Sequence, residues 1–271
     1  MTSPVLTFPK SLWQRRELWW NLSRREVSGR YRGSVLGWSW SFLTPLLMLA
    51  VYTFVFSEVF QSRWEPGSGN TGTLEFAINL FAGLIAFNLF SECANKAPTL
   101  ILSNSNYVTK VVFPLEILAA VTVAAASFHA FTSVLILALF QLLGQGSIPL
   151  TIVFLPLIWL PLLLGCLGLT WLLAALGVFL RDISQVVGVA VSMLMFLSAV
   201  FYPVTALPER WRPLLSLNPL VRIIEQTRRV CVNGLLPQPL YLLVGMGMGL
   251  LVCELGYRSF QKSRRAFADV M

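Results

Sequence analysis

Residues 24–60 have the sequence RREVSGRYRGSVLGWSWSFLTPLLMLAVYTFVFSEVF. Several arginines lie at its start. They are followed by residues 33–57, which are mostly apolar and carry no charge. An uncharged apolar run of more than about 18 residues is a candidate transmembrane helix, and basic residues beside it mark the end that stays in the cytoplasm. The segment therefore predicts a membrane-spanning helix with a basic cytoplasmic approach.

The composition places the chain in a membrane. Of its 271 residues, 56% are hydrophobic and only 12% are charged, whereas soluble proteins are about one quarter charged. The bilayer must therefore solvate most of the chain. An isoelectric point near 9.7 would suit nucleic acid binding, but the excess basic residues flank apolar segments, where they set membrane topology instead.

Uncharged intervals divide the chain into six apolar segments, which predict an all-α membrane protein with six transmembrane helices. The interval between Glu116 and Arg181 is long enough for two helices, and the sequence GQGSIP at residues 144–149 predicts the turn between them. The expected spans of this single transmembrane domain are residues 34–60, 75–93, 113–142, 150–180, 183–203 and 240–257.

Basic residues are distributed unequally between the two ends of these spans. Fourteen lysines and arginines lie in the terminal segments, in the loop at residues 94–112 and at Arg181, against six in the other loops. The positive-inside rule therefore predicts that both termini, including the tail at residues 258–271, lie in the cytoplasm. Five arginines between residues 204 and 239 are an exception to this bias.

Two segments outside the spans have unusual patterns. In residues 1–33, tryptophans and leucines alternate with arginines at roughly helical spacing, which predicts an amphipathic interfacial helix; the alternative is a solvated basic tail. In residues 204–239, prolines separate short apolar pieces. This pattern is compatible with a re-entrant element buried in protein and equally with a plain external loop.

The sequence lacks the motifs of common catalytic sites. It contains no GxxxxGK[ST] loop for ATP, no GxSxG and no HExxH. The four cysteines form no CxxC pair and are expected to be packing residues. The single histidine, His129, has no carboxylate near it in the sequence, which favours a neutral side chain hydrogen-bonded between helices over a functional ionisable group.

The energy for any transport must come from another protein. Proton-driven transporters usually carry carboxylates in mid-membrane, whereas the acidic residues here fall near the predicted span ends. A cytoplasmic partner is the simplest source. The loop at residues 94–112 has an apolar centre between polar flanks, which predicts a short amphipathic helix docked on that partner; the alternative is a loop that skims the membrane.

A family resemblance begins in the opening segment. The pattern RRExxxRYRGSxLGxxWSFLxPLLMLxVYTFVFSxVF at residues 24–60 resembles the permease subunit of ABC-2-type polysaccharide exporters, most of all O-antigen exporters of Gram-negative bacteria. Capsule exporters tend to have RFGKxRLGYLW where this chain has RYRGSVLGWSW, which favours an O-antigen-like or teichoic-acid-like glycan. Shorter matches along nearly the whole chain lie at residues 81–92, 104–118, 178–183, 201–204, 217–220 and 267–271.

The resemblance implies a homodimer in the bacterial inner membrane, bound to two copies of a separate cytoplasmic ATPase. That ATPase would bind ATP and magnesium, so no cofactor or metal is expected in this chain, and the chain itself would not be an enzyme. The implied substrate is a polysaccharide on an undecaprenyl pyrophosphate carrier, moved from the cytoplasm to the periplasm.

Three groups of candidate site residues follow from the arginines, the aromatic residues and the resemblance. Guanidinium suits bidentate phosphate contact, and aromatic rings stack on sugar faces. The gate and lipid-pyrophosphate group comprises Arg30, Tyr31, Arg32, Gly33, Ser34 and Gly37. The glycan path comprises Trp38, Tyr52, Phe56, Phe60, Phe201 and Tyr202. The ATPase-coupling group comprises Leu100, Ile101, Leu102, Asn104, Tyr107 and Lys110.

Each group has a plainer interpretation. The arginines would also serve as membrane anchors, the aromatic residues as interfacial belts, and the glycines as close-packing positions. Two other functions also remain open: an ABC-2 permease for a teichoic acid, another lipid or a drug, and a membrane enzyme acting on lipid-linked sugars. The second would use Glu92, Glu116 and Asp182, which are predicted near the inner face without a recognisable motif.

Overall fold

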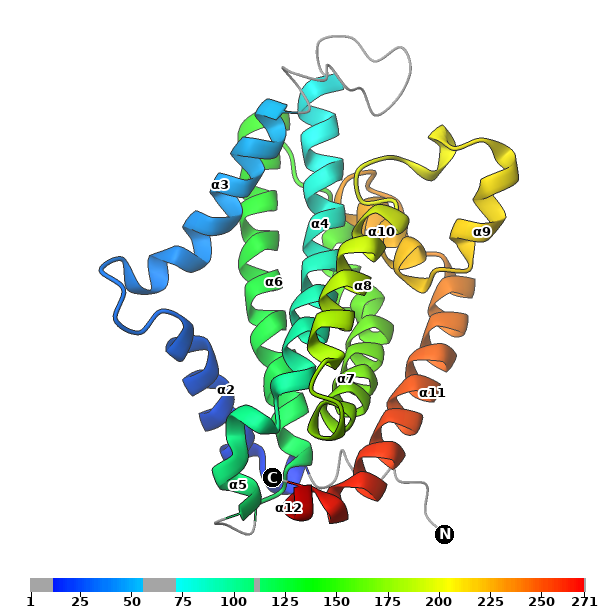
Figure 1. Cartoon of the computed structure of the whole chain (residues 1–271). Coiled ribbons are helices and arrows are strands. Elements are labelled where there is room, and N and C mark those ends of the chain that lie inside the picture. The colour runs from blue at the N-terminus through cyan, green and yellow to red at the C-terminus, as the bar shows by residue number, and fades with distance from the viewer. Residues whose placement is uncertain (1–11, 56–71, 110–112, 271) are drawn as a thin grey trace.

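The computed structural model describes residues 12–55, 72–109 and 113–270, and within these ranges every regular element is helical. The all-α prediction is confirmed. Among the described residues, four helices are long and apolar enough to cross a membrane. They are α4 (Gly72–Lys96), α6 (Glu116–Gln145), α7 (Leu155–Phe179) and α11 (Pro239–Ser263), which lie roughly side by side in Figure 1.

Two further apolar helices are shorter. Helices α8 (Ile183–Leu197) and α3 (Trp40–Phe54) have 15 residues each, about 22 Å at 1.5 Å per residue. A bilayer core is about 30 Å thick, so neither length alone makes a full span. The count of six transmembrane helices therefore stays a prediction.

The N-terminal helix and the first expected span meet at an irregular turn. Helix α2 (Arg16–Arg30) buries Ser23 and Val27 and packs against α6. The chain then turns through Gly33 and Gly37, whose φ angles of 84° and 49° favour glycine. Helical structure resumes only with the short helix η1 (Gly37–Ser39) and then α3, so the span expected from residue 34 is not helical at its start.

The turn predicted at residues 144–149 is present. Helix α6 ends at Gly146, which adopts a left-handed conformation (φ 72°) and donates its backbone N–H to the carbonyl of Leu142. This is the usual way in which glycine terminates a helix. The 3-10 helix η5 (Leu150–Phe154) then leads into α7.

The segment between the fifth and sixth expected spans folds back into the helical bundle. After α8 it forms η6 (Val204–Ala206), η7 (Glu209–Trp211), α9 (Arg212–Ser216) and α10 (Pro219–Cys231). Nine of the thirteen residues of α10 are buried, and α10 packs against α4 and α7 (Figure 1). This part of the segment is therefore buried within the protein, and the choice between a re-entrant element and an external one stays a prediction.

Helix α10 starts where the sequence LNPL provides a start signal. The Asn218 side chain accepts a hydrogen bond of 3.0 Å from the backbone N–H of Leu220, and Pro219 occupies the first helical position. Asn218 also donates to the carbonyl of Leu197 and to the hydroxyl of Ser198. One residue thus caps α10 and ties it to the end of α8.

Helices α7 and α11 pack so closely that their backbones are in contact. A Cβ added to Gly168 would lie 2.3 Å from the carbonyl oxygen of Val252, and one added to Gly256 would lie 2.0 Å from that of Gly168. Small residues at such positions let membrane helices approach closely. At the end of α11, the C-terminal tail buries Phe267 against Phe260, and Arg264 pairs with Glu116 at the start of α6.

Candidate functional site: an arginine–glutamate–histidine cluster beside the entry turn

Three ionisable side chains from three helices meet beside the turn between α2 and α3. Arg30 ends α2, Glu92 lies in the last turns of α4, and His129 lies near the middle of α6. Arg30 Nη1 is 3.1 Å from Glu92 Oε1, and His129 Nδ1 is 3.0 Å from Glu92 Oε2. Arg30 Nη1 also lies 2.7 Å from His129 Nδ1.

The predicted hydrogen bond of His129 between helices is present. A carboxylate partner exists, but it lies 37 residues away in the sequence and reaches His129 only because α4 packs against α6. His129 lies thirteen residues past the start of α6, about 20 Å along the helix. Charged groups inside membrane helices are costly and usually functional, so the cluster is the leading site candidate.

Aromatic rings surround the cluster. The ring of Tyr31 meets His129 edge-on at 6.2 Å between centroids and lies 6.3 Å from Trp38. Trp38 in turn contacts Phe128, the neighbour of His129, at 5.8 Å. The structure therefore brings together Arg30, Tyr31 and Trp38, which the sequence placed in two different groups.

The other residues predicted for the gate form the turn itself. Arg32 and Ser34 are exposed, and Ser34 accepts a hydrogen bond of 2.9 Å from the indole N–H of Trp40. A Cβ added to Gly33 or Gly37 would meet no atom within 4 Å. The two glycines therefore allow the positive φ angles of an open turn. They are not close-packing positions within this chain.

The predicted glycan-path residues that the structure describes fall at two levels. Trp38 lies at the cluster, whereas Tyr52 on α3 contacts Phe201 at 6.5 Å between ring centroids, beyond the end of α8. Phe201 also lies 5.5 Å from Phe196, and the Tyr202 hydroxyl donates to the Phe196 carbonyl at 2.8 Å. Phe56 and Phe60 lie outside the described residues.

The predicted coupling segment is a series of short helices: η3 (Ala97–Thr99), η4 (Leu102–Asn104) and α5 (Ser105–Thr109). Leu100 and Ile101 are 6% and 0% exposed, so the expectation that they contact a partner is corrected: their side chains pack inward against the bundle. Leu102 is exposed and can make such a contact.

The remaining coupling residues hold the segment in place. The Asn104 side chain donates to the Leu100 carbonyl at 2.9 Å, and Tyr107 stacks on Phe113 with centroids 4.4 Å apart. The Tyr107 hydroxyl accepts a hydrogen bond of 3.2 Å from Arg25 of α2. Lys110 lies outside the described residues.

A second contact joins α2 to the coupling segment. Glu26, next to Arg25, forms an ion pair with Lys96 at the end of α4, where η3 begins. At η3 itself, a Cβ on Gly177 of α7 would lie 1.9 Å from the Pro98 carbonyl oxygen, so the backbones touch. Movement of the coupling segment would therefore displace residues that contact it on both α2 and α7.

At the other end of the bundle, one of the unexpected arginines is buried. Arg228 of α10 is 5% exposed and donates to the backbone carbonyls of Asn79 (2.9 Å), Ala199 (2.9 Å) and Val200 (2.6 Å). These carbonyls lie on α4 and just after α8. A Cβ at Gly83 would lie 2.7 Å from the Arg228 guanidinium, so the glycine makes room for it.

Side chains from three other helical elements donate hydrogen bonds to the same part of α10. Gln141 donates to the carbonyl of Cys231 at 2.7 Å, and Thr151 donates to that of Val230 at 2.6 Å. The indole of Trp159 donates to the Thr227 hydroxyl at 3.0 Å. Because α6, η5 and α7 all contribute, α10 is held from several directions.

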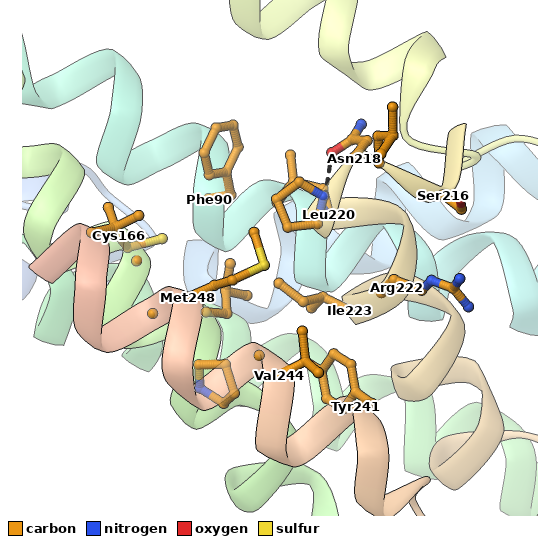
Figure 2. Close-up of a pocket in the computed structure, with 18 of the residues that line it drawn as sticks. Phe90, Cys166, Ser216, Asn218, Leu220, Arg222, Ile223, Tyr241, Val244 and Met248 are labelled. Atoms are coloured by element: carbon orange, nitrogen blue, oxygen red, sulfur yellow. Dashed lines mark hydrogen bonds between the residues drawn. The ribbon is translucent and has the colours of Figure 1, made fainter. Parts of the chain in front are cut away.

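An apolar groove of about 580 Å³ lies between α7, α10 and α11 (Figure 2). Phe90, Ile223, Val244 and Met248 are among its lining residues. The hydroxyl of Tyr241 donates to the carbonyl of Ile158 at 2.9 Å, so its polar end is already engaged. The groove suits hydrocarbon chains of the bilayer better than a hydrated sugar.

Comparison with known proteins agrees with these features. The family model described as ABC-2 type transporter matches residues 17–231. A permease from Myxococcus xanthus, named O-antigen export system permease protein RfbA, is 31% identical over 98% of this chain and 99% of its own length. A Klebsiella pneumoniae protein of the same name is 22% identical over 92% and 93%. The Escherichia coli polysialic acid transport protein KpsM is 24% identical over 78% and 79%.

Proposed function

Because this chain belongs to the ABC-2 type transporter family, we propose that it is the membrane-spanning subunit of an ATP-driven exporter of a lipid-linked polysaccharide. The observation that carries the proposal is the similarity to the Myxococcus xanthus O-antigen permease along almost the full length of both chains. The weaker similarity to the polysialic acid transport protein favours an O-antigen-like glycan.

In this proposal the substrate is carried on undecaprenyl pyrophosphate and moves from the cytoplasm to the periplasm through a homodimer in the inner membrane. Arg30 and the exposed Arg32 recruit the lipid head, because guanidinium groups suit phosphate oxygens. The rings of Trp38, Tyr52 and Phe201 offer stacking surfaces for sugars at two levels of the bundle. The turn through Gly33 and Gly37 is the hinge of the inner gate.

Two copies of a cytoplasmic ATPase supply the energy, docking on the exposed side of η4 and α5. The contacts Arg25–Tyr107 and Glu26–Lys96 then pass the movement of this segment to α2. The gate therefore receives the motion through side chains on the same helix that ends in Arg30.

Deletion of the chain from its host tests the transport proposal. The expected result is loss of one surface polysaccharide, with its lipid-linked form accumulating in the inner membrane. Re-expression of the chain should restore export. Normal surface polysaccharide would overturn the proposal, and loss of a teichoic acid or another lipid instead would identify the alternative substrate.

A pair of leucine variants tests the docking surface. Leu102→Asp should abolish co-purification with the ATPase, because it places a charge in an apolar contact. Leu214→Asp is the matched control, since Leu214 is also exposed but lies on α9 at the opposite end of the bundle (Figure 1). Equal co-purification of both variants would move the docking surface elsewhere.

A further inference from the structure

The hydrogen bonds of the Arg30–Glu92–His129 cluster cannot all form at once. Arg30 Nη1 can only donate, and the Glu92 carboxylate can only accept. His129 Nδ1 lies within hydrogen-bond distance of both, at 2.7 Å and 3.0 Å. Without a proton, Nδ1 accepts from Arg30 but opposes the Glu92 lone pairs; with a proton, it donates to Glu92 but opposes the Arg30 N–H. With Nδ1 protonated, Arg30 donates to Oε1 of Glu92 and His129 to Oε2, so His129 remains as a donor when Arg30 leaves the carboxylate.

The three side chains also differ in exposure. The side chains of Glu92 and His129 are 18% and 16% exposed, whereas that of Arg30 is 51% exposed. Nη1 of Arg30 makes the contacts with the other two, and a guanidinium has five N–H donors in total. Arg30 is therefore the member that an external anion can reach.

We propose that Glu92 is an internal anion that occupies Arg30 until the substrate pyrophosphate replaces it. This inference rests on the proposed function and adds the regulation of that site. When Arg30 turns to the pyrophosphate, the Nδ1–H form of His129 keeps its hydrogen bond to Glu92 Oε2, and no proton is transferred. The Glu92 carboxylate therefore always has a hydrogen-bond donor, which matters because an uncompensated charge away from water is costly. Since Arg30 ends α2, the exchange releases that end of α2 from α4 and α6.

The proposal gives variants of the two charged residues opposite effects. Glu92→Gln has nearly the same shape but no charge, so it removes the competitor for Arg30. It should tighten binding of farnesyl pyrophosphate, a short polyprenyl pyrophosphate, to the purified complex with its ATPase by about tenfold, an energy of about 1.4 kcal/mol. Arg30→Gln should weaken binding at least as much. Glu75→Gln, at the other end of α4, is the matched control and should leave the affinity unchanged.

His129 is tested through its dependence on Glu92. His129→Leu removes the replacement donor, so it should hold Arg30 on Glu92 and weaken probe binding several-fold. In the Glu92→Gln background the same change should have little further effect, because no carboxylate remains to be satisfied. This non-additivity separates the exchange from a general packing defect, which would weaken binding in both backgrounds.

The outcomes separate the inference from the proposed function. Unchanged or weaker probe binding in Glu92→Gln, with binding lost in Arg30→Gln, would overturn the exchange and leave the carrier assignment standing. Absence of binding in the unsubstituted complex would overturn both. Glu92→Asp is the second variant should Glu92→Gln fail to assemble: it draws the carboxylate back by one methylene and should tighten binding by a smaller factor, and no tightening would again overturn the exchange.

Discussion

Arg30 and Arg228 occupy opposite kinds of environment. The side chain of Arg30 is half exposed and contacts two side chains, whereas Arg228 is buried and donates to three backbone carbonyls. A contact between two side chains breaks when either one rotates, whereas the carbonyls bound by Arg228 belong to the backbone and move only with the chain. The difference indicates that the region around α2 can rearrange, whereas the region around α10 is a fixed scaffold.

The largest expected effect lies in the scaffold. Arg228→Leu removes three charge-assisted hydrogen bonds and leaves buried carbonyls unsatisfied, so the free energy of unfolding should fall by about 3 kcal/mol or more. The thermal midpoint and the yield of folded protein in detergent measure it. Arg222→Leu on the same helix is the control, because Arg222 is exposed and should change little. Similar melting of the two variants would contradict the scaffold role.

A second scaffold test uses two glycines of α7. Gly168→Ala places a Cβ 2.3 Å from the Val252 carbonyl oxygen, and overpacking of this kind costs about 2 kcal/mol. Gly165→Ala meets no atom within 4 Å and should be nearly neutral. Thermal midpoints of the two variants give the comparison. Because alanine favours a helix over glycine, an equal loss with Gly165→Ala would mean that the contact with α11 does not explain the effect.

The sequence predicted the parts of this molecule that depend on local pattern. Four of the six apolar segments form helices long enough to cross a membrane among the described residues, and α6 ends in the turn expected at residues 144–149. The arginine at position 30 was also a candidate from its place beside the first apolar run. Each of these features depends on residues close together in the chain.

The parts that the sequence did not predict depend on distant contacts. Glu92 and His129 are 37 residues apart, and Arg228 reaches Asn79 across 149 positions, so no local pattern could pair them. Leu100 and Ile101 were predicted to form a docking surface, but they are buried. An apolar centre between polar flanks occurs in a protein core as well as in an interface, so the local pattern does not distinguish the two. The five arginines after residue 204 contradict the positive-inside rule, and this excess could have indicated that one of them, Arg228, has a structural role.

The hinge should show a smaller effect on stability and a clear effect on transport. Gly37→Leu forces a residue with a side chain to φ near 49°, which costs of order 1 kcal/mol, and it should stall export while ATP binding by the partner persists. Gly29→Leu is the matched control, because a Cβ there also meets no atom within 4 Å but the backbone is helical. Export in a strain that carries each variant is the measurement. Normal export with Gly37→Leu would remove the hinge from the mechanism.

The smallest effect should come from the contact between α2 and the coupling segment. Tyr107→Phe deletes the hydroxyl that Arg25 contacts but keeps the ring stacked on Phe113, so folding should change by less than about 1 kcal/mol. If α2 receives motion through this contact, the amount of glycan exported per ATP hydrolysed should fall by about twofold. Arg25→Gln should produce the same fall, and the double variant should be no worse than either single one. Additive losses would mean that the two residues act separately, and α2 would then be driven through Glu26 and Lys96 alone.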